Sequence, residues 1–183
     1  MGHNAYEVHM PYLRRLFTSI SAFLIASMLW AGPIAISFGH SALSFDPYCA
    51  NSLEAMAGVS ACLGDRMELN LGLSAQLTPR PFSDIQVQAE LALNLTGKNV
   101  RPNSAGDNIS VMAALGVIAS DHNPQGLFLP TTITLRLYPA VVGSPLSARR
   151  ERLIPIGVAY NLMTRQFALY WSFIIYDHYI VTR

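Results

Sequence analysis

Eleven residues, Ile85 to Leu95, alternate between apolar side chains and side chains that are polar or small. A period of two is typical of a β-strand, because successive side chains of a strand point to opposite faces. An amphipathic helix would instead repeat its apolar residues roughly every three to four positions. We therefore expect a strand with one apolar face and with its other face in contact with water. The apolar row consists of Ile85, Val87, Ala89, Leu91, Leu93 and Leu95.

Five other segments have the composition of strands and are bounded by loops rich in Gly, Pro, Asn and Asp. Because no helical run separates consecutive strands, a parallel doubly wound sheet is disfavoured. The expected fold is mainly β, an antiparallel sandwich or small barrel of about six strands. One of the five, Ile109–Ala119, is also compatible with a short helix. The segments are Met67–Ser74, Ile109–Ala119, Thr131–Tyr138, Leu153–Leu162 and Phe167–Val181.

The N-terminal part of the chain contains a long uncharged segment. Arg14 and Arg15 come directly before the run Leu16–Phe38, which carries no charged side chain. Cationic residues followed by an apolar stretch are typical of a signal peptide, and the full run is also long enough for a membrane-spanning helix. Either interpretation leaves the arginines in the cytoplasm and exports the rest. We therefore expect residues 1–44 to comprise a cytoplasmic tip and a hydrophobic helix, with membrane contact through residues 16–38.

Small residues near the end of this run offer two sites for signal-peptide cleavage. Residues 35–37 (AIS) and 37–39 (SFG) both have the small-x-small pattern. The sequence leaves cleavage and permanent anchoring open as alternatives. In both cases we expect residues 45–183 to form a single β-rich domain in a periplasmic, lumenal or extracellular space.

The chain has two cysteines, Cys49 and Cys62. In an exported protein a close pair of cysteines indicates one disulfide. Between them, Asn51 or Ser52 can cap a short helix and Gly64 can end it. The sequence therefore predicts a Cys49–Cys62 disulfide that ties one short helix to the segment before it.

Charged residues make up only 13% of the chain, about half of the usual share, while hydrophobic residues reach 51%. A shortage of charge indicates membrane contact, an interface buried in a larger assembly, or a signal segment. The formal net charge of +1 gives no support for nucleic-acid binding, which requires a clustered basic surface. The one dense cationic cluster is Arg149, Arg150 and Arg152, which we expect to lie in a solvated turn.

No sequence motif points to a particular chemistry. The dipeptides Asp121-His122 and Asp177-His178 carry the only candidate groups, and neighbours in a strand point to opposite faces, so neither is a ready-made catalytic pair. The cysteines lack the spacing of a zinc site. We therefore expect a protein that is not an enzyme and has no cofactor and no metal site.

The final run, Phe167–Val181, is aromatic on both faces. An aromatic strand this apolar is unsuited to open solvent, so it indicates a partner surface. The leading hypothesis is a non-enzymatic exported or membrane-anchored β-domain that binds a protein partner, as an accessory subunit of a membrane complex. The expected partner-binding residues are Tyr170, Trp171, Phe173, Tyr176 and Tyr179.

Two alternative functions remain open. A small barrel could carry an apolar ligand or lipid inside, because the Ala- and Gly-rich run Ile109–Ala119 leaves space. Alternating strands of about ten residues are also the signature of an outer-membrane-type β-barrel. That barrel requires about eight strands and aromatic girdles, whereas six strands are expected here and the aromatic residues gather in the last one. The terminal pair Thr182-Arg183 also differs from the aromatic residue expected at the end of such barrels.

Overall fold

The computed structural model describes residues 33–44, 52–78, 81, 84–99, 109–121, 129–143 and 148–181. Every regular element in these ranges is a β-strand, and none of their residues belongs to a helix long and apolar enough to cross a membrane. The strands are β1 (Ile34–Ser44), β2 (Ser52–Cys62), β3 (Met67–Thr78), β4 (Ile85–Asn94), β5 (Ile109–Ser120), β6 (Pro130–Gly143), β7 (Arg149–Leu153), β8 (Ile156–Asn161), β9 (Gln166–Trp171) and β10 (Ile174–Val181).

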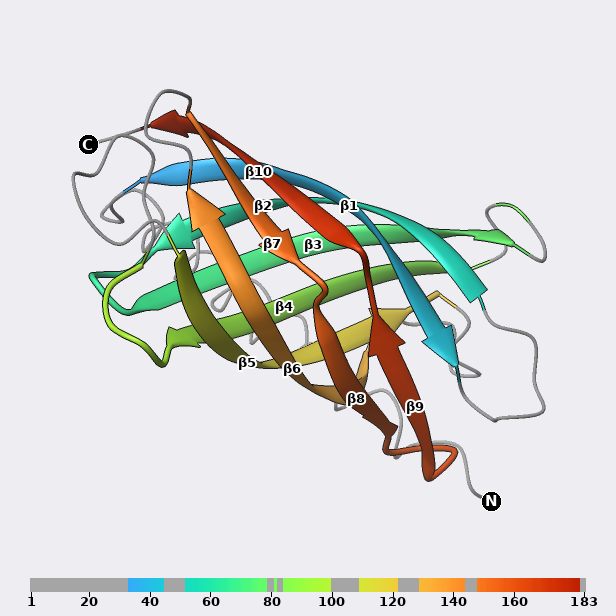
Figure 1. Cartoon of the computed structure of the whole chain (residues 1–183). Helices are drawn as coiled ribbons and strands as arrows, with labels where there is room; N and C mark the ends of the chain where they lie inside the picture. The colour runs from blue at the N-terminus through green and yellow to red at the C-terminus, as the bar shows by residue number, and fades with distance from the viewer. Residues whose placement is uncertain are drawn as a thin grey trace, which may run out of the picture. The chain divides into compact units, whose positions relative to one another are not determined.

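The ten strand segments form a closed antiparallel barrel of eight strands. Strands β1 to β6 each pair with the next strand along the chain. Segments β7 and β8 both pair with β6, so they are two halves of the seventh strand, and β9 and β10 are two halves of the eighth. The eighth strand pairs with β1, which closes the barrel (Figure 1). A closed barrel has no sheet edge, so every strand finds two hydrogen-bonding neighbours.

The seventh and eighth strands are interrupted at the same level. Ile154 and Pro155 separate β7 from β8, and Ser172 and Phe173 separate β9 from β10. Hydrogen bonds continue across the gap: the Ile154 N–H donates to the Phe173 carbonyl (2.8 Å), and the Ser172 N–H donates to the Pro155 carbonyl (2.9 Å). Proline has no N–H to contribute to a regular ladder, which accounts for the break at this position.

The structure corrects the expected strand count and the first domain boundary. Segments β1, β2 and β7 are strands that the sequence pattern did not reveal. Residues 34–44, expected within the targeting segment, pair with β2 and β10 as part of the barrel. Cleavage after residue 37 or 39 would remove the first part of β1. Of the hydrophobic segment expected to contact the membrane over residues 16–38, residues 16–32 lie outside the described residues, and residues 34–38 belong to β1 and not to a helix.

The short helix expected between the cysteines is instead β2. Small residues allow this strand to lie very close to β3, and a Cβ atom at Gly58 would be 2.4 Å from the Leu71 carbonyl oxygen. The predicted disulfide is not formed: Cys62 is a buried thiol whose Sγ lies 4.0 Å from the Glu68 carboxylate. Cys49 lies outside the described residues.

The two faces of the strands are reversed relative to the expectation from their alternation. In β4 the apolar residues Val87 and Leu91 point outward, with 46% and 44% of their surface exposed. The polar residues Gln86, Glu90 and Asn94 point into the barrel and are buried. The alternation in β4 was predicted correctly, but the polar row of this strand faces the barrel interior and not water.

Candidate functional site

Polar and charged side chains fill the centre of the barrel. The arginines of β7 reach it because Arg150 and Arg152 alternate with Arg149 and Glu151, so one pair points inward and the other outward. Strands β3, β4, β6 and β10 direct further charged groups to the same space. The charged residues buried in this network are Glu68, Glu90, Arg136, Arg150, Arg152 and Asp177.

Arg150 is fully enclosed by two carboxylates. Its two terminal nitrogens donate to the two oxygens of Glu68, at 2.5 and 2.8 Å. Its Nε donates to Oδ2 of Asp177 at 2.7 Å. Arg150 and Asp177 are also directly opposite each other in the β7–β10 register. Paired donation to a carboxylate is among the strongest side-chain interactions, because the planar guanidinium matches the carboxylate geometry.

Arg152 extends this network toward β1 and β2. Its Nη2 donates to Oδ1 of Asp177 at 2.7 Å and to the hydroxyls of Ser37 and Ser60 at 3.1 and 3.0 Å. The Ser37 hydroxyl in turn donates to Asp177 at 2.7 Å. The Nη1 atom of Arg152 lies 3.8 Å from the Glu90 carboxylate, so Arg152 connects the ion pairs around Arg150 to those around Glu90. Five strands of the barrel thus share one connected set of charges.

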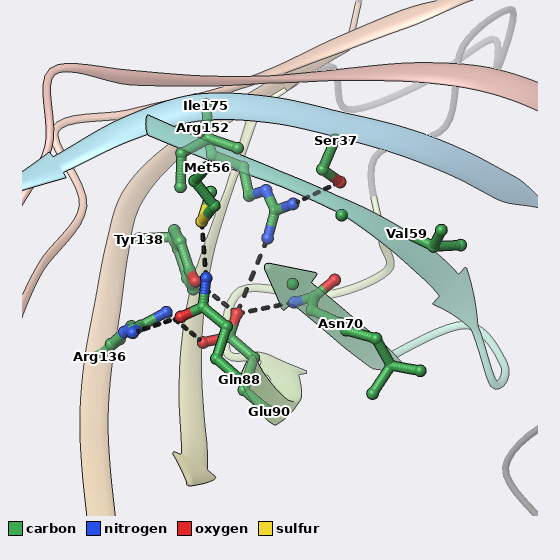
Figure 2. Close-up of a pocket in the computed structure, with 13 residues that line it drawn as sticks. Ser37, Met56, Val59, Asn70, Gln88, Glu90, Arg136, Tyr138, Arg152 and Ile175 are labelled. Atoms are coloured by element: carbon green, nitrogen blue, oxygen red, sulfur yellow. Dashed lines mark hydrogen bonds and ion pairs between the residues drawn. The ribbon is translucent and has the colours of Figure 1, made fainter. Parts of the chain in front are cut away.

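Glu90 is the centre of a second group, shown in Figure 2. It forms an ion pair with Arg136 at 3.1 Å and accepts hydrogen bonds from Asn70 (2.8 Å) and from the Tyr138 hydroxyl. Arg136 also donates to the Gln88 side chain at 2.7 Å. The Glu90 carboxylate therefore has partners from β3, β6 and β7, all reached from β4.

Tyrosine rings cover the buried guanidinium groups. The Arg136 guanidinium lies 4.0 Å from the Tyr170 ring centroid, Arg150 lies 5.6 Å from that of Tyr179, and Arg152 lies 5.3 Å from that of Tyr138. At these distances the negative face of an aromatic ring attracts a cation. The rings therefore stabilise arginines that have lost contact with water.

Little free space remains between these groups. The cavity bordered by Ser37, Asn70, Glu90, Arg136 and Arg152 has a volume of about 20 Å³. That volume accommodates one water molecule and is far too small for a lipid or another apolar ligand. Eight strands enclose an interior that side chains can fill, and here they fill it with charge.

The network balances three guanidinium groups against three carboxylates, Glu68, Glu90 and Asp177. A fourth buried carboxylate, Glu54, lies toward the other end of the barrel and accepts a hydrogen bond from Gln86 at 3.0 Å. Within the described ranges, no cluster of three His, Cys, Asp or Glu side chains has a geometry suited to a metal ion. The arrangement joins strands across the interior, and each charged group in it already has partners.

The five aromatic residues expected to bind a partner do not share one surface. Tyr170 and Tyr179 point into the barrel and are buried. Trp171, Phe173 and Tyr176 point outward, and Trp171 and Phe173 make an edge-to-face contact with centroids 5.0 Å apart. The interruption at residues 172–173 shifts the alternation by one residue, so Tyr170 points inward whereas Tyr176, an even number of residues later, points outward.

The arginine cluster was also assigned to the wrong environment. Arg149 is exposed as expected, but Arg150 and Arg152 are buried in the barrel. One signal for this environment was present in the sequence: Arg150 and Arg152 are two residues apart, so both point to the same face of a strand. Glu68 and Asn70 on β3, and Gln88 and Glu90 on β4, have the same spacing. Of the two Asp-His dipeptides, Asp177 faces inward while its neighbour His178 faces outward, and His122 lies outside the described residues.

Comparisons with known proteins identify no family. No family model and no curated protein matches the chain. Among solved structures, the solution NMR structure of the de novo designed protein TMB2.3 is similar over 81% of this chain and 96% of its own, with 10% sequence identity and a TM-score of 0.46.

Proposed function

We propose that this protein is an integral membrane β-barrel with a sealed interior, which serves as a rigid scaffold in the membrane and not as a channel. The observation that carries the proposal is the reversed polarity of the barrel. Its interior holds three arginines with their carboxylates, and its exterior presents large apolar side chains on nearly every strand. Soluble monomers rarely expose continuous apolar patches of more than a few hundred Å².

The strand lengths support a membrane location. Strands β2 to β6 contain between 10 and 14 residues. A tilted transmembrane strand requires about 9 to 11 residues to cross the hydrocarbon core. Closure of the barrel satisfies the backbone groups that lipid cannot hydrogen-bond. The eight strands also remove the objection that six would be too few for this class of barrel.

The packed interior supports a scaffold and argues against transport. A conducting barrel needs a continuous aqueous path, whereas the central cavity here is about 20 Å³ and is surrounded by ion pairs. The same packing is unfavourable for an apolar ligand carried inside. The function in this proposal therefore belongs to the barrel's outer surface and to its loops.

Export fits the same proposal. Arg14 and Arg15 followed by the apolar run from Leu16 have the form of a signal peptide. For the barrel to stay intact, cleavage would have to occur before β1 begins at Ile34. The two small-x-small sites within β1 do not meet this requirement. We infer an exported, non-enzymatic protein that inserts into a membrane through its strands.

Binding of a protein partner is a second candidate function. Trp171, Phe173 and Tyr176 lie on neighbouring outward positions of the eighth strand, and Phe38 lies opposite Tyr176 in the β1–β10 register. Trp and Tyr are enriched both at membrane–water interfaces and at protein–protein interfaces. In a membrane barrel this strip would contact the partner within the lipid phase, as an accessory subunit would.

The experiment is to refold the urea-denatured chain with and without phosphatidylcholine vesicles. The proposal predicts that the barrel folds only with vesicles, floats with them, and migrates on gels at a different position before and after heating. It also predicts no ion conductance in planar bilayers. A folded, monomeric barrel in lipid-free and detergent-free buffer would overturn membrane insertion, and steady conductance would overturn the sealed interior.

A further inference from the structure

Two glycines face each other on the inner wall of the barrel. Gly58 on β2 and Gly72 on β3 are directly opposite in the strand register, and Gly72 follows the inward-pointing Asn70 by two residues. Both glycines border the cavity of about 20 Å³ that Asn70, Glu90 and Arg152 also line (Figure 2). Because glycine has no side chain, the hydrogen-bonding partners for a molecule in this cavity come from the neighbouring polar side chains.

Asn70 has an amide oxygen that lacks a hydrogen-bond donor among the described residues. The Nδ2 group of Asn70 donates to the Glu90 carboxylate at 2.8 Å. A carboxylate accepts hydrogen bonds and does not donate them, so this contact fixes which end of the amide is nitrogen. The remaining atom, Oδ1, is buried without a partner. Burial of an acceptor without a donor is unfavourable, so a donor in the cavity would stabilise the barrel.

Arg152 has a donor group that lacks a close acceptor. Its Nη2 atom makes the hydrogen bonds to Asp177 and to the two serines described above. Its Nη1 atom lies 3.8 Å from the Glu90 carboxylate and 4.0 Å from that of Glu68, and both distances exceed those of a hydrogen bond. Polar groups at such separations are often connected through water. An acceptor in the cavity would complete the hydrogen bonding of this guanidinium.

The molecule in the cavity therefore has to accept and donate hydrogen bonds. An anion only accepts and would lie beside the Glu90 carboxylate, and a metal cation would lie beside the Arg136 and Arg152 guanidinium groups. The three guanidinium groups already balance three carboxylates, so any added ion would bring an unpaired charge into the interior. Water is neutral, both accepts and donates, and fits a cavity of this volume.

We propose that this cavity binds one ordered water molecule, which accepts a hydrogen bond from Arg152 Nη1 and donates one to Asn70 Oδ1. An apolar cavity of similar size would stay dry, whereas buried water is retained where polar groups require partners. The water joins β7 to β3 at a point where direct hydrogen bonds between their side chains are missing from the described network. The site belongs to the barrel interior, so it goes beyond the proposed membrane scaffold and does not depend on contact with lipid.

The first measurement is oxygen-17 magnetic relaxation dispersion on the full chain folded in detergent micelles, which counts long-lived internal water molecules. Asn70→Leu preserves the approximate size of the side chain but removes the amide oxygen, so it should lower the count by one relative to the parent chain. Asn94→Leu is the matched control, because Asn94 is a buried inward asparagine of β4 that does not line the cavity. This control should retain the water.

A crystal structure of the parent chain is the second measurement, and it decides the question if Asn70→Leu does not fold. It should show one water about 3 Å from both Asn70 Oδ1 and Arg152 Nη1. Equal counts for the parent chain and Asn70→Leu, or no electron density at this position, would overturn the water site. An anomalous peak in the cavity after soaking in bromide would overturn it in favour of an anion. A barrel that folds in lipid-free buffer would contradict the proposed function alone, because the water site can be measured there in the same way.

Discussion

At the residue scale, the unusual feature is the burial of three arginines in a barrel of this size. Arg150 donates to Glu68 and Asp177 with none of its side chain exposed. Transferring a charged group out of water costs free energy, so a buried arginine is tolerated only when carboxylates and other acceptors pair with it. Arg149 points outward and Arg150 points inward, so substitutions of these two neighbours compare an exposed arginine with a buried one.

Arg150→Ala should destabilise the barrel by about 3 to 5 kcal/mol, because it leaves the Glu68 and Asp177 carboxylates buried without their main partner. Arg149→Ala should change the free energy of unfolding by no more than about 0.5 kcal/mol, since its side chain is exposed. Urea titration of both variants in vesicles measures the difference. Equal effects would show that the interior network contributes no more than a surface charge.

At the element scale, the interruption of the last two strands sets which residues point inward. Ile154 adopts a φ of 49°, a left-handed conformation that costs a β-branched residue about 1 to 2 kcal/mol. Pro155, next to it, is fully buried. The break therefore stores strain that the surrounding ladder holds in place.

Ile154→Gly should raise the free energy of unfolding by about 0.5 to 1 kcal/mol, because glycine adopts this conformation without strain and loses only part of that gain to chain entropy. Ile156→Gly, two residues later in β8, should lower it by a similar amount, since it weakens a regular strand. Thermal or urea unfolding provides both values. A loss of stability in the first variant would mean that Ile154 is not strained.

Much of the element pattern could be predicted from the sequence, and the missing part has physical causes. Strands β3, β4 and β6 follow from alternation with a period of two, whereas the segment of β5 is apolar throughout and left a short helix open as an alternative. Segment β2 resembled a helix because its Ala-rich composition favours one, and tertiary pairing with β3 overrides that preference. Segment β7 resembled a solvated turn because charged residues occupy both faces, and only the carboxylates of distant strands explain the inward pair Arg150 and Arg152.

At the scale of the whole molecule, alternation alone does not indicate which face is inside. A strand of a soluble sandwich and a strand of a membrane barrel have the same period, and the orientation depends on the solvent around the fold. The low charge content of 13% is the sequence feature that fits the second case. Glu68 and Glu90 become ion-pair partners of the β7 arginines only when the barrel closes and brings their strands together.

In the proposed membrane location, Leu135→Arg should destabilise the barrel in vesicles by about 2 to 4 kcal/mol, because Leu135 points outward from the middle of β6 and would face the most apolar part of the bilayer. Ile109→Arg, at the first position of β5, should cost only about 0 to 1 kcal/mol near the interface. Unfolding by urea in vesicles compares them. Equal and small effects would place both residues in water.

The most direct test of the membrane location is fluorescence quenching of Trp171, which points outward with 38% of its surface exposed. A Trp30→Phe background leaves Trp171 as the sole tryptophan of the chain. Vesicles of phosphatidylcholine with brominated acyl chains should quench its emission strongly, while water-soluble iodide should not. Strong quenching by iodide together with no effect of the brominated lipid would place this surface in water and contradict the membrane barrel.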